Sequence, residues 1–149
     1  MSPTNEDAIQ ALTDSLSQVL EEAAFMFLEP VEEGDEPPPF EEEPLTSAMG
    51  FSGSAQGRIY LSTDRGTCMG LASELMGVDE DELSPTDGEA SLGELLNIVA
   101  GVLMEALYGA EALISLQPPE TATGQGKQGQ VKISMLTDMG QRFDLSLEV

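Results

Sequence analysis

Two polar side chains, Glu94 and Asn97, lie three positions apart within residues 87–107. On a helix that turns about 100° per residue, both would share one line with the small residues Ala90 and Gly101. Asn is a poor choice in the middle of a helix, and Gly costs about 1 kcal/mol there relative to Ala. An amide, a carboxylate and room for close backbone approach on one line are the groups that a second molecule could bind.

The segment around these two side chains has the period of an amphipathic helix. Apolar side chains recur at intervals of three and four residues: Leu92, Leu95, Leu96, Val99, Leu103, Ala106 and Leu107. The remaining line is polar or small throughout: Asp87, Ala90, Glu94, Asn97, Gly101 and Glu105. Such a line is most often only the solvated face of a helix, and its glycine can equally admit a neighbouring element of the same fold. Both interpretations stay open at this point.

The composition excludes several classes of function. Five basic against 28 acidic residues give the 149-residue chain a net charge of -23. Nucleic acid and anionic membrane surfaces are bound through Lys and Arg, so we expect neither as a partner. Cys68 is the only cysteine and there is no His, which excludes zinc sites of the Cys/His type and nucleophilic catalysis by a Ser–His or Cys–His pair.

The length suits one domain, residues 1–149, with a sizeable hydrophobic core. The first residues lack the basic start and apolar run of a signal peptide. No stretch reaches the roughly 20 consecutive apolar residues of a membrane span. We therefore expect a cytoplasmic protein without a membrane partner.

The N-terminal part predicts a helix followed by a linker. Start signals at Pro3 and Thr4 and an apolar stripe that includes Phe27 predict a helix over residues 4–28, with its last turns enclosed. Residues 29–44 are acidic and rich in proline, which predicts an extended and partly mobile linker. The spacing of its carboxylates is not that of a calcium loop, and we expect no metal site.

A hairpin and a second helix are expected next. Residues 45–51 and 55–62 are short β candidates around a Ser-Gly-Ser turn. A helix follows, capped by Thr63 or Asp64, and Gly77 is its predicted stop.

The C-terminal part consists mainly of predicted strands. Residues 110–116 predict a strand, which the prolines of residues 117–119 interrupt, and residues 124–129 predict a flexible loop. Residues 130–136 and 142–149 alternate in polarity like half-buried antiparallel strands. This order of elements predicts an α+β fold with an antiparallel sheet and long helices packed on one of its faces.

The central helix resembles the active helix of the CheC/CheX/FliY chemotaxis phosphatases. The motif of that family is Ser or Asp, three residues, Glu, two residues, Asn, and then a Pro about 22 positions further on; Glu94, Asn97 and Pro119 match it. Residues 49–61 also resemble the first hairpin of the CheX branch, and residues 71–77 its following helix. The resemblance implies a CheC-like fold closest to CheX, with one active surface per chain and a homodimer.

The resemblance also implies a substrate, a phosphorylated CheY-type response-regulator receiver that carries an aspartyl phosphate. Such a receiver brings its own Mg²⁺ and Lys, so the chain needs no cofactor of its own. What remains to be supplied is a water held in line with the phosphorus, since phosphoryl transfer depends on positioning and electrostatics. Asn97 would orient this water and Glu94 would pair with the Lys of the receiver. Ala90, Gly101 and Pro119 would contact the partner.

One position departs from the family motif. The Ser or Asp of the motif falls on Ala90, and the neighbouring Ser91 would point about 100° away from it. Two functions are therefore carried forward: a receiver phosphatase, and a non-catalytic module of the same fold that binds a receiver or the flagellar switch.

Overall fold

The computed structural model describes residues 4–32 and 34–149, so the start signal at Pro3 and Glu33 of the predicted linker lie outside the described residues. The helices are α1 (Asn5–Ala24), α2 (Arg65–Met76), the short 3-10 helix η1 (Glu80–Glu82) and α3 (Pro85–Tyr108). The strands are β1 (Leu28–Pro30), β2 (Pro44–Gly53), β3 (Gly57–Asp64), β4 (Ile114–Leu116), β5 (Glu120–Thr123), β6 (Val131–Thr137) and β7 (Arg142–Glu148).

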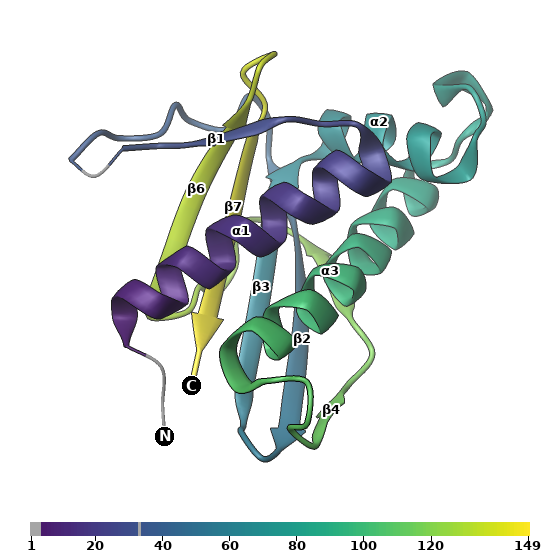
Figure 1. The fold of residues 1–149 in the computed structure, drawn as a ribbon. Helices are drawn as coiled ribbons and strands as arrows, with labels where there is room; N and C mark the ends of the chain where they lie inside the picture. The colour runs from purple at the N-terminus through teal and green to yellow at the C-terminus, as the bar shows by residue number, and fades with distance from the viewer. Residues whose placement is uncertain (1–3, 33) are drawn as a thin grey trace.

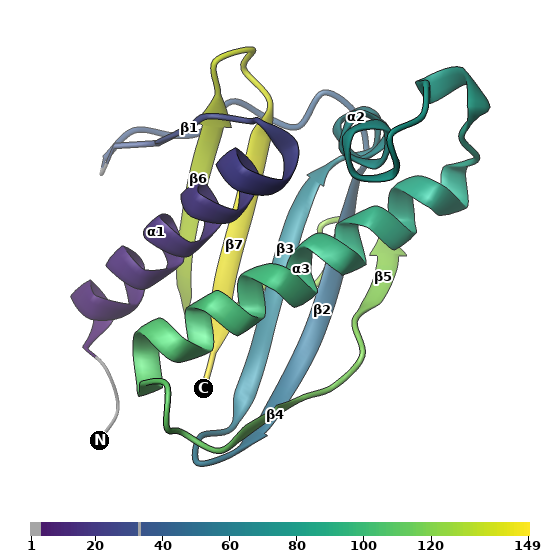
Figure 2. The same cartoon turned by 45° about the vertical axis from the view of Figure 1, so that its right-hand side comes forward.

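Across the described residues, seven strands form one antiparallel sheet in the order β1-β6-β7-β3-β2-β4, and β5 also pairs with β2. Helices α1 and α3 lie on one face of this sheet, and α2 packs against both near the end of β3 (Figure 1). The second view shows α3 running diagonally across the strands (Figure 2). The predicted α+β fold, with its helices on one sheet face, is confirmed.

The hydrophobic core lies between the helices and the inner face of the sheet. Alternate residues of the strands point into it and are fully buried, as Leu45, Ile59 and Leu61 show. From α1, Leu12 and Leu16 meet these side chains at the three- and four-residue spacing of a helix face. The interior is mainly aliphatic and holds few aromatic rings.

The predicted hairpin and second helix are both present. Strands β2 and β3 pair in a register that places Leu45 opposite Thr63 and Met49 opposite Ile59. Helix α2 follows β3 directly and ends at Gly77, whose φ of 69° is the left-handed conformation that glycine adopts at low cost.

Asp64 occupies the N-cap position of α2 but does not cap the helix. Its carboxylate instead accepts hydrogen bonds from the backbone N–H groups of Glu41 (3.3 Å) and Glu42 (3.2 Å). The side chain of Glu42 accepts a hydrogen bond from the N–H of Gly66 in the first turn of α2. The linker therefore caps the helix, and Asp64 holds the linker in place.

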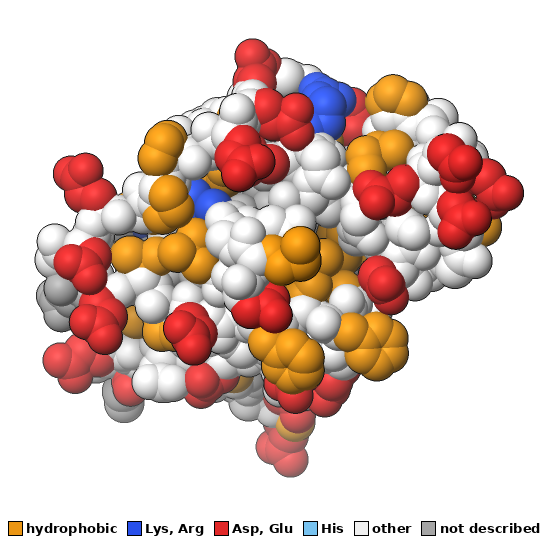
Figure 3. Space-filling view, turned by 90° about the horizontal axis from the view of Figure 1, so that it is seen from above, with side chains coloured by type: hydrophobic (Ala, Val, Ile, Leu, Met, Phe, Trp, Pro, Cys, Tyr) orange, Lys and Arg blue, Asp and Glu red, His pale blue; other side chains and the backbone are white. Residues whose placement is uncertain are grey.

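Helix α1 begins as predicted and ends earlier. The Thr4 hydroxyl accepts a hydrogen bond from the N–H of Asp7 (3.1 Å). The helix stops at Ala24, because Phe25 adopts a left-handed conformation (φ 54°) and the following chain pairs with β6. The prediction of enclosed last turns was wrong, since Phe25 and Phe27 are 75% and 59% exposed. In the view from above, exposed hydrophobic side chains stand among acidic ones (Figure 3).

The linker is held against the sheet at several points. Its first residues belong to β1 and its last, Pro44, begins β2, while the described residues between them form no helix or strand. Arg142 of β7 donates a hydrogen bond to the carbonyl of Pro38 (3.0 Å), and its guanidinium lies 4.2 Å from the centre of the Phe40 ring. These contacts restrict the segment for which the composition alone predicted mobility.

The segment 124–130 crosses the outer face of the sheet, from β5 beside β2 to β6 beyond β3 and β7. The hydroxyl of Thr46 donates to the carbonyl of Gly124 (2.7 Å), and the N–H of Gly129 donates to the Ser146 hydroxyl (2.9 Å). The predicted flexible loop is thus hydrogen-bonded to the sheet at both ends. Because the loop covers part of the outer face, polar side chains of the strands are buried there.

Cys68 is fully buried in α2, and loss of hydration is the main reason that its pKa rises to about 12. Only the thiolate reacts with alkylating agents. We therefore expect native protein at pH 8 to react with iodoacetamide at least about 100-fold more slowly than protein unfolded in urea. Mass spectrometry of the alkylated fraction over time measures both rates. Equal rates would show that the α2–α3 layer opens readily.

Candidate active surface on helix α3

Helix α3 is defined at both ends by its sequence. Pro85 stands at its first position, where a missing N–H costs nothing. The carboxylate of Asp87 accepts a hydrogen bond from the N–H of Ser84 (2.8 Å), the reciprocal bond of a capping box. Gly109, with φ 90°, follows the last residue, Tyr108, as predicted.

Most of the circumference of α3 is buried against α1, α2 and the sheet. Five of the seven predicted apolar positions, Leu92, Leu95, Leu96, Val99 and Leu103, are inaccessible to solvent. Leu107 is half-buried, and the prediction was wrong at Ala106, which is exposed in the last turn of the helix. By length and composition alone, this helix is apolar enough to match a membrane span. Half of its most apolar stretch is buried inside the fold, and this position in the core accounts for the apolar character of the helix.

Five of the six positions predicted to form one outward line do so. Ala90, Glu94, Asn97, Gly101 and Glu105 are exposed, and we call this line the α3 stripe. The sixth position, Asp87, is half-buried and serves the helix cap. Among the residues that the structure describes, no atom of a neighbouring element lies within 4 Å of the point where Gly101 would carry a Cβ. The glycine therefore does not admit another element of this fold, and its side of the helix is open.

The side chains of Glu94 and Asn97 do not stabilise their own fold through polar contacts within residues 4–32 and 34–149. Neither side chain forms a hydrogen bond or ion pair there, whereas Glu89, on another side of α3, lies 3.9 Å from Arg65. One helical turn separates the amide from the carboxylate, so the two can meet the same partner. Their position on a helix that is packed on its other sides gives them a rigid base.

Ser91 cannot replace the hydroxyl that Ala90 lacks. Its side chain is only 6% exposed and points into the fold, while Ala90 is exposed on the α3 stripe. The N-terminal end of the stripe therefore presents a methyl group where the family motif has a polar side chain.

Pro119 lies against α3 close to the α3 stripe. A Cβ added to Gly93 would come 3.3 Å from Cγ of Pro119, so the proline ring occupies the space that the glycine leaves. Gly93 is four residues before Asn97 and shares its side of the helix. The structure thus brings together the Glu, the Asn and the Pro that the motif separates along the chain.

One residue of this surface was not assigned from the sequence. Ile98 follows Asn97, lies one turn after Glu94, and is 38% exposed. In the sequence it fitted neither the buried stripe nor the polar line. An apolar residue that falls outside the buried period of a helix is the signal that could have identified it.

The surface around the α3 stripe is acidic. Glu94 and Glu105 lie on the stripe itself, and none of the five basic residues of the chain belongs to α3. Arg65, at the start of α2, reaches Glu89 and the hydroxyl of Thr123 (2.9 Å) instead. No group of three acidic or cysteine side chains suited to a metal ion occurs among the described residues. The stripe offers a carboxylate for a cation and an amide that can both donate and accept.

An antiparallel sheet with long helices packed on one face is the fold of the CheC-like class of proteins. CheX from Vibrio vulnificus is similar over 99% of this chain and 100% of its own, with 18% identity and a TM-score of 0.72. A chain of the CheX–CheY–BeF3–Mg complex from Borrelia burgdorferi is similar over 95% and 97%, with 20% identity and a TM-score of 0.68. FliY from Thermotoga maritima is similar over 98% and 92%, with 14% identity and a TM-score of 0.62. At these identities the similarity shows the fold.

The family follows from the sequence. Residues 45–141 match the family of the chemotaxis phosphatase CheX. The chain belongs to the CheX family. No curated protein matches the sequence significantly.

Proposed function

We propose that this protein is a cytoplasmic phosphatase of chemotaxis that hydrolyses the aspartyl phosphate of a CheY-type receiver. The observation that carries the proposal is the pair Glu94 and Asn97, which are exposed side by side on a rigid helix and bind no side chain or backbone group of the described residues. Membership of the CheX family and the CheX–CheY complex of the Borrelia relative support the choice of partner. The family resemblance also predicts that the protein acts as a homodimer.

In the proposed reaction, the oxygen of a water attacks the phosphorus, the bond from phosphorus to the acyl oxygen breaks, and the products are the receiver aspartate and inorganic phosphate. The side-chain oxygen of Asn97 accepts a hydrogen bond from this water and holds it in line with the bond that breaks. Most of the catalytic effect then comes from positioning, as in other phosphoryl transfers. A neutral amide suits this place because a carboxylate would repel the phosphoryl oxygens.

The other residues of the surface hold the receiver in register. Glu94 pairs with the receiver Lys, and the Mg²⁺ that neutralises the phosphoryl charge arrives with the receiver. Gly101 and Ala90 carry no bulky side chain, so the backbone of α3 can approach the partner closely. Pro119, packed beside Gly93, borders the same surface.

Phosphate release from a phosphorylated receiver tests the function directly. The wild-type protein is expected to accelerate release, and Glu94→Ala to raise the KM for the receiver. Equal release with and without the wild-type protein would leave the second candidate function, a receiver-binding module without catalysis. Ala90 is the observation that favours this second candidate, because the polar residue of the motif is absent there.

Restoring the motif at that position gives a specific prediction. Ala90→Ser places a hydroxyl on the exposed N-terminal end of the α3 stripe. If this hydroxyl gains one hydrogen bond to the receiver, kcat/KM is expected to rise about two- to ten-fold, the value of one such bond. Stopped-flow measurement of phosphate release checks it, with Ser at the exposed position Ala106 as the control. A fall in kcat/KM would mean that the methyl group itself contacts the partner.

A further inference from the structure

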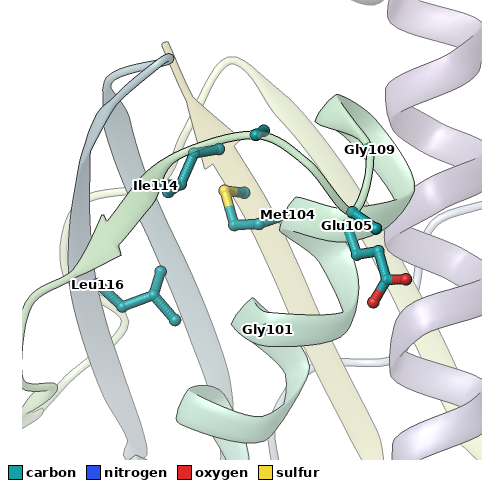
Figure 4. Close-up of a pocket in the computed structure, with 8 residues that line it drawn as sticks. Gly101, Met104, Glu105, Gly109, Ile114 and Leu116 are labelled. Atoms are coloured by element: carbon teal, nitrogen blue, oxygen red, sulfur yellow. The ribbon is translucent and has the colours of Figure 1, made fainter.

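A groove opens beside the C-terminal half of α3, between the helix and the chain that leads into β4 (Figure 4). Its volume of about 230 Å³ is several times the roughly 30 Å³ that one water occupies in the liquid, so it can hold a side chain. Met104, Ile114 and Leu116 give it an apolar floor, and Glu105 lines its edge with the carboxylate turned away from these three side chains.

The groove is continuous with the α3 stripe. Gly101 belongs to both, and it lies one helical turn beyond Asn97 on the same side of the helix. Within the described part of the chain, no other element lies within 4 Å of a Cβ position at Gly101 or Gly109, which keeps the groove open. A protein that covers Glu94 and Asn97 therefore reaches the groove without leaving the helix.

We infer that this groove receives an apolar side chain of the phosphorylated receiver, next to a Lys or Arg that meets Glu105. The inference rests on the proposed function and adds to it a determinant of partner choice. The apolar floor favours a hydrocarbon side chain, because burying one stabilises a complex in proportion to the area removed from water. The described residues that line the groove include no Lys or Arg, so a cation that pairs with Glu105 in the complex would come from the partner.

A matched pair of variants separates the groove from the rest of the surface. Ala110 lines the groove, whereas Ala106 is equally exposed at the end of α3 and does not line it. Ala110→Leu fills the groove and leaves Glu94, Asn97 and Gly101 unchanged. Ala106→Leu adds the same side chain elsewhere, and neither substitution alters a core position.

Both variants are made in an Asn97→Ala background, so that the receiver stays phosphorylated during the measurement. Titration calorimetry with a CheY-type receiver, phosphorylated by acetyl phosphate in the presence of Mg²⁺, gives the Kd. Ala110→Leu is expected to raise the Kd about ten-fold or more, the effect of denying one apolar side chain its site, and Ala106→Leu to leave it unchanged. Glu105→Gln is expected to raise it about two- to five-fold, because exposed ion pairs contribute little.

The outcomes distinguish the inference from the proposed function. If wild-type protein releases phosphate but Ala110→Leu and Ala106→Leu bind the receiver alike, the groove inference is overturned and the phosphatase stands. If no receiver binds to any form, both are overturned. If Ala110→Leu changes the sedimentation of the protein alone and not its Kd for the receiver, the groove belongs to a contact between copies of this chain, which also overturns the inference.

Discussion

Replacing Asn97 by alanine is expected to lower the kcat of phosphate release at least about 100-fold, the usual cost of losing one positioned polar group at a reacting centre. Binding of the receiver should change little, because Glu94 and the rest of the α3 stripe remain. Asn97 is exposed and its side chain has no hydrogen-bond partner in residues 4–32 and 34–149, and alanine is the better helix former. The variant should therefore be at least as stable as the wild type. Single-turnover phosphate release and a thermal melt measure the two effects.

The control for this substitution is Gln18→Ala, which removes an exposed amide from the middle of α1, away from the α3 stripe. It should match the wild type in kcat. An Asn97→Ala protein that keeps kcat within three-fold of the wild type would show that the water is held by another group. Such a result would reject the proposed role of the amide and leave the fold assignment untouched.

The second large effect is expected on stability. Asp144 is almost fully buried on the outer face of β7, where it accepts two hydrogen bonds from Arg142 (2.7 and 2.9 Å) and one from Ser134 (2.7 Å). Lys132 lies 3.4 Å away. Asp144→Ala leaves the buried guanidinium without its partner and should lower the free energy of unfolding by about 3–5 kcal/mol. That is a large share of the roughly 5–15 kcal/mol of a typical domain.

Urea denaturation measures the loss, with Asp138→Ala in the exposed β6–β7 turn as the control that should cost little. The double variant Arg142→Ala/Asp144→Ala should be less destabilised than the sum of the two single variants, because both single variants abolish the same ion pair and its loss is then counted only once. A loss below about 1 kcal/mol for Asp144→Ala would mean that the pair is solvated in solution like a surface ion pair.

Regular periodicity made the main elements predictable, and tertiary contacts decided the rest. The long helix α3, the β2–β3 hairpin and strands β6 and β7 follow from apolar spacing within single segments. The short strands β1 and β5 were missed because Leu28–Pro30 contains a proline and Glu120–Thr123 has no apolar alternation. Both exist because they pair with a neighbour, β6 or β2, that a local pattern does not reveal.

The candidate site likewise contains residues that local spacing predicts and residues that only tertiary contacts bring into place. Helical spacing was enough to place Glu94 and Asn97 on one exposed line. Sequence spacing could suggest Pro119 only through a family motif, since the second half of α3 and strand β4 separate it from Gly93 along the chain. The groove depends on how the chain after α3 returns to the sheet, which no local pattern of the helix encodes.

The α3 stripe and the buried sides of the same helix consist of different residues. Side chains at positions 90, 94 and 97 face solvent, so replacements there would change the proposed hydrolysis or the choice of partner without destabilising the fold. Descendants of one such protein can thus diverge into active enzymes and silent adaptors through one or two surface replacements. Ala90 is one such replacement, and a single further change there would restore the polar residue of the motif.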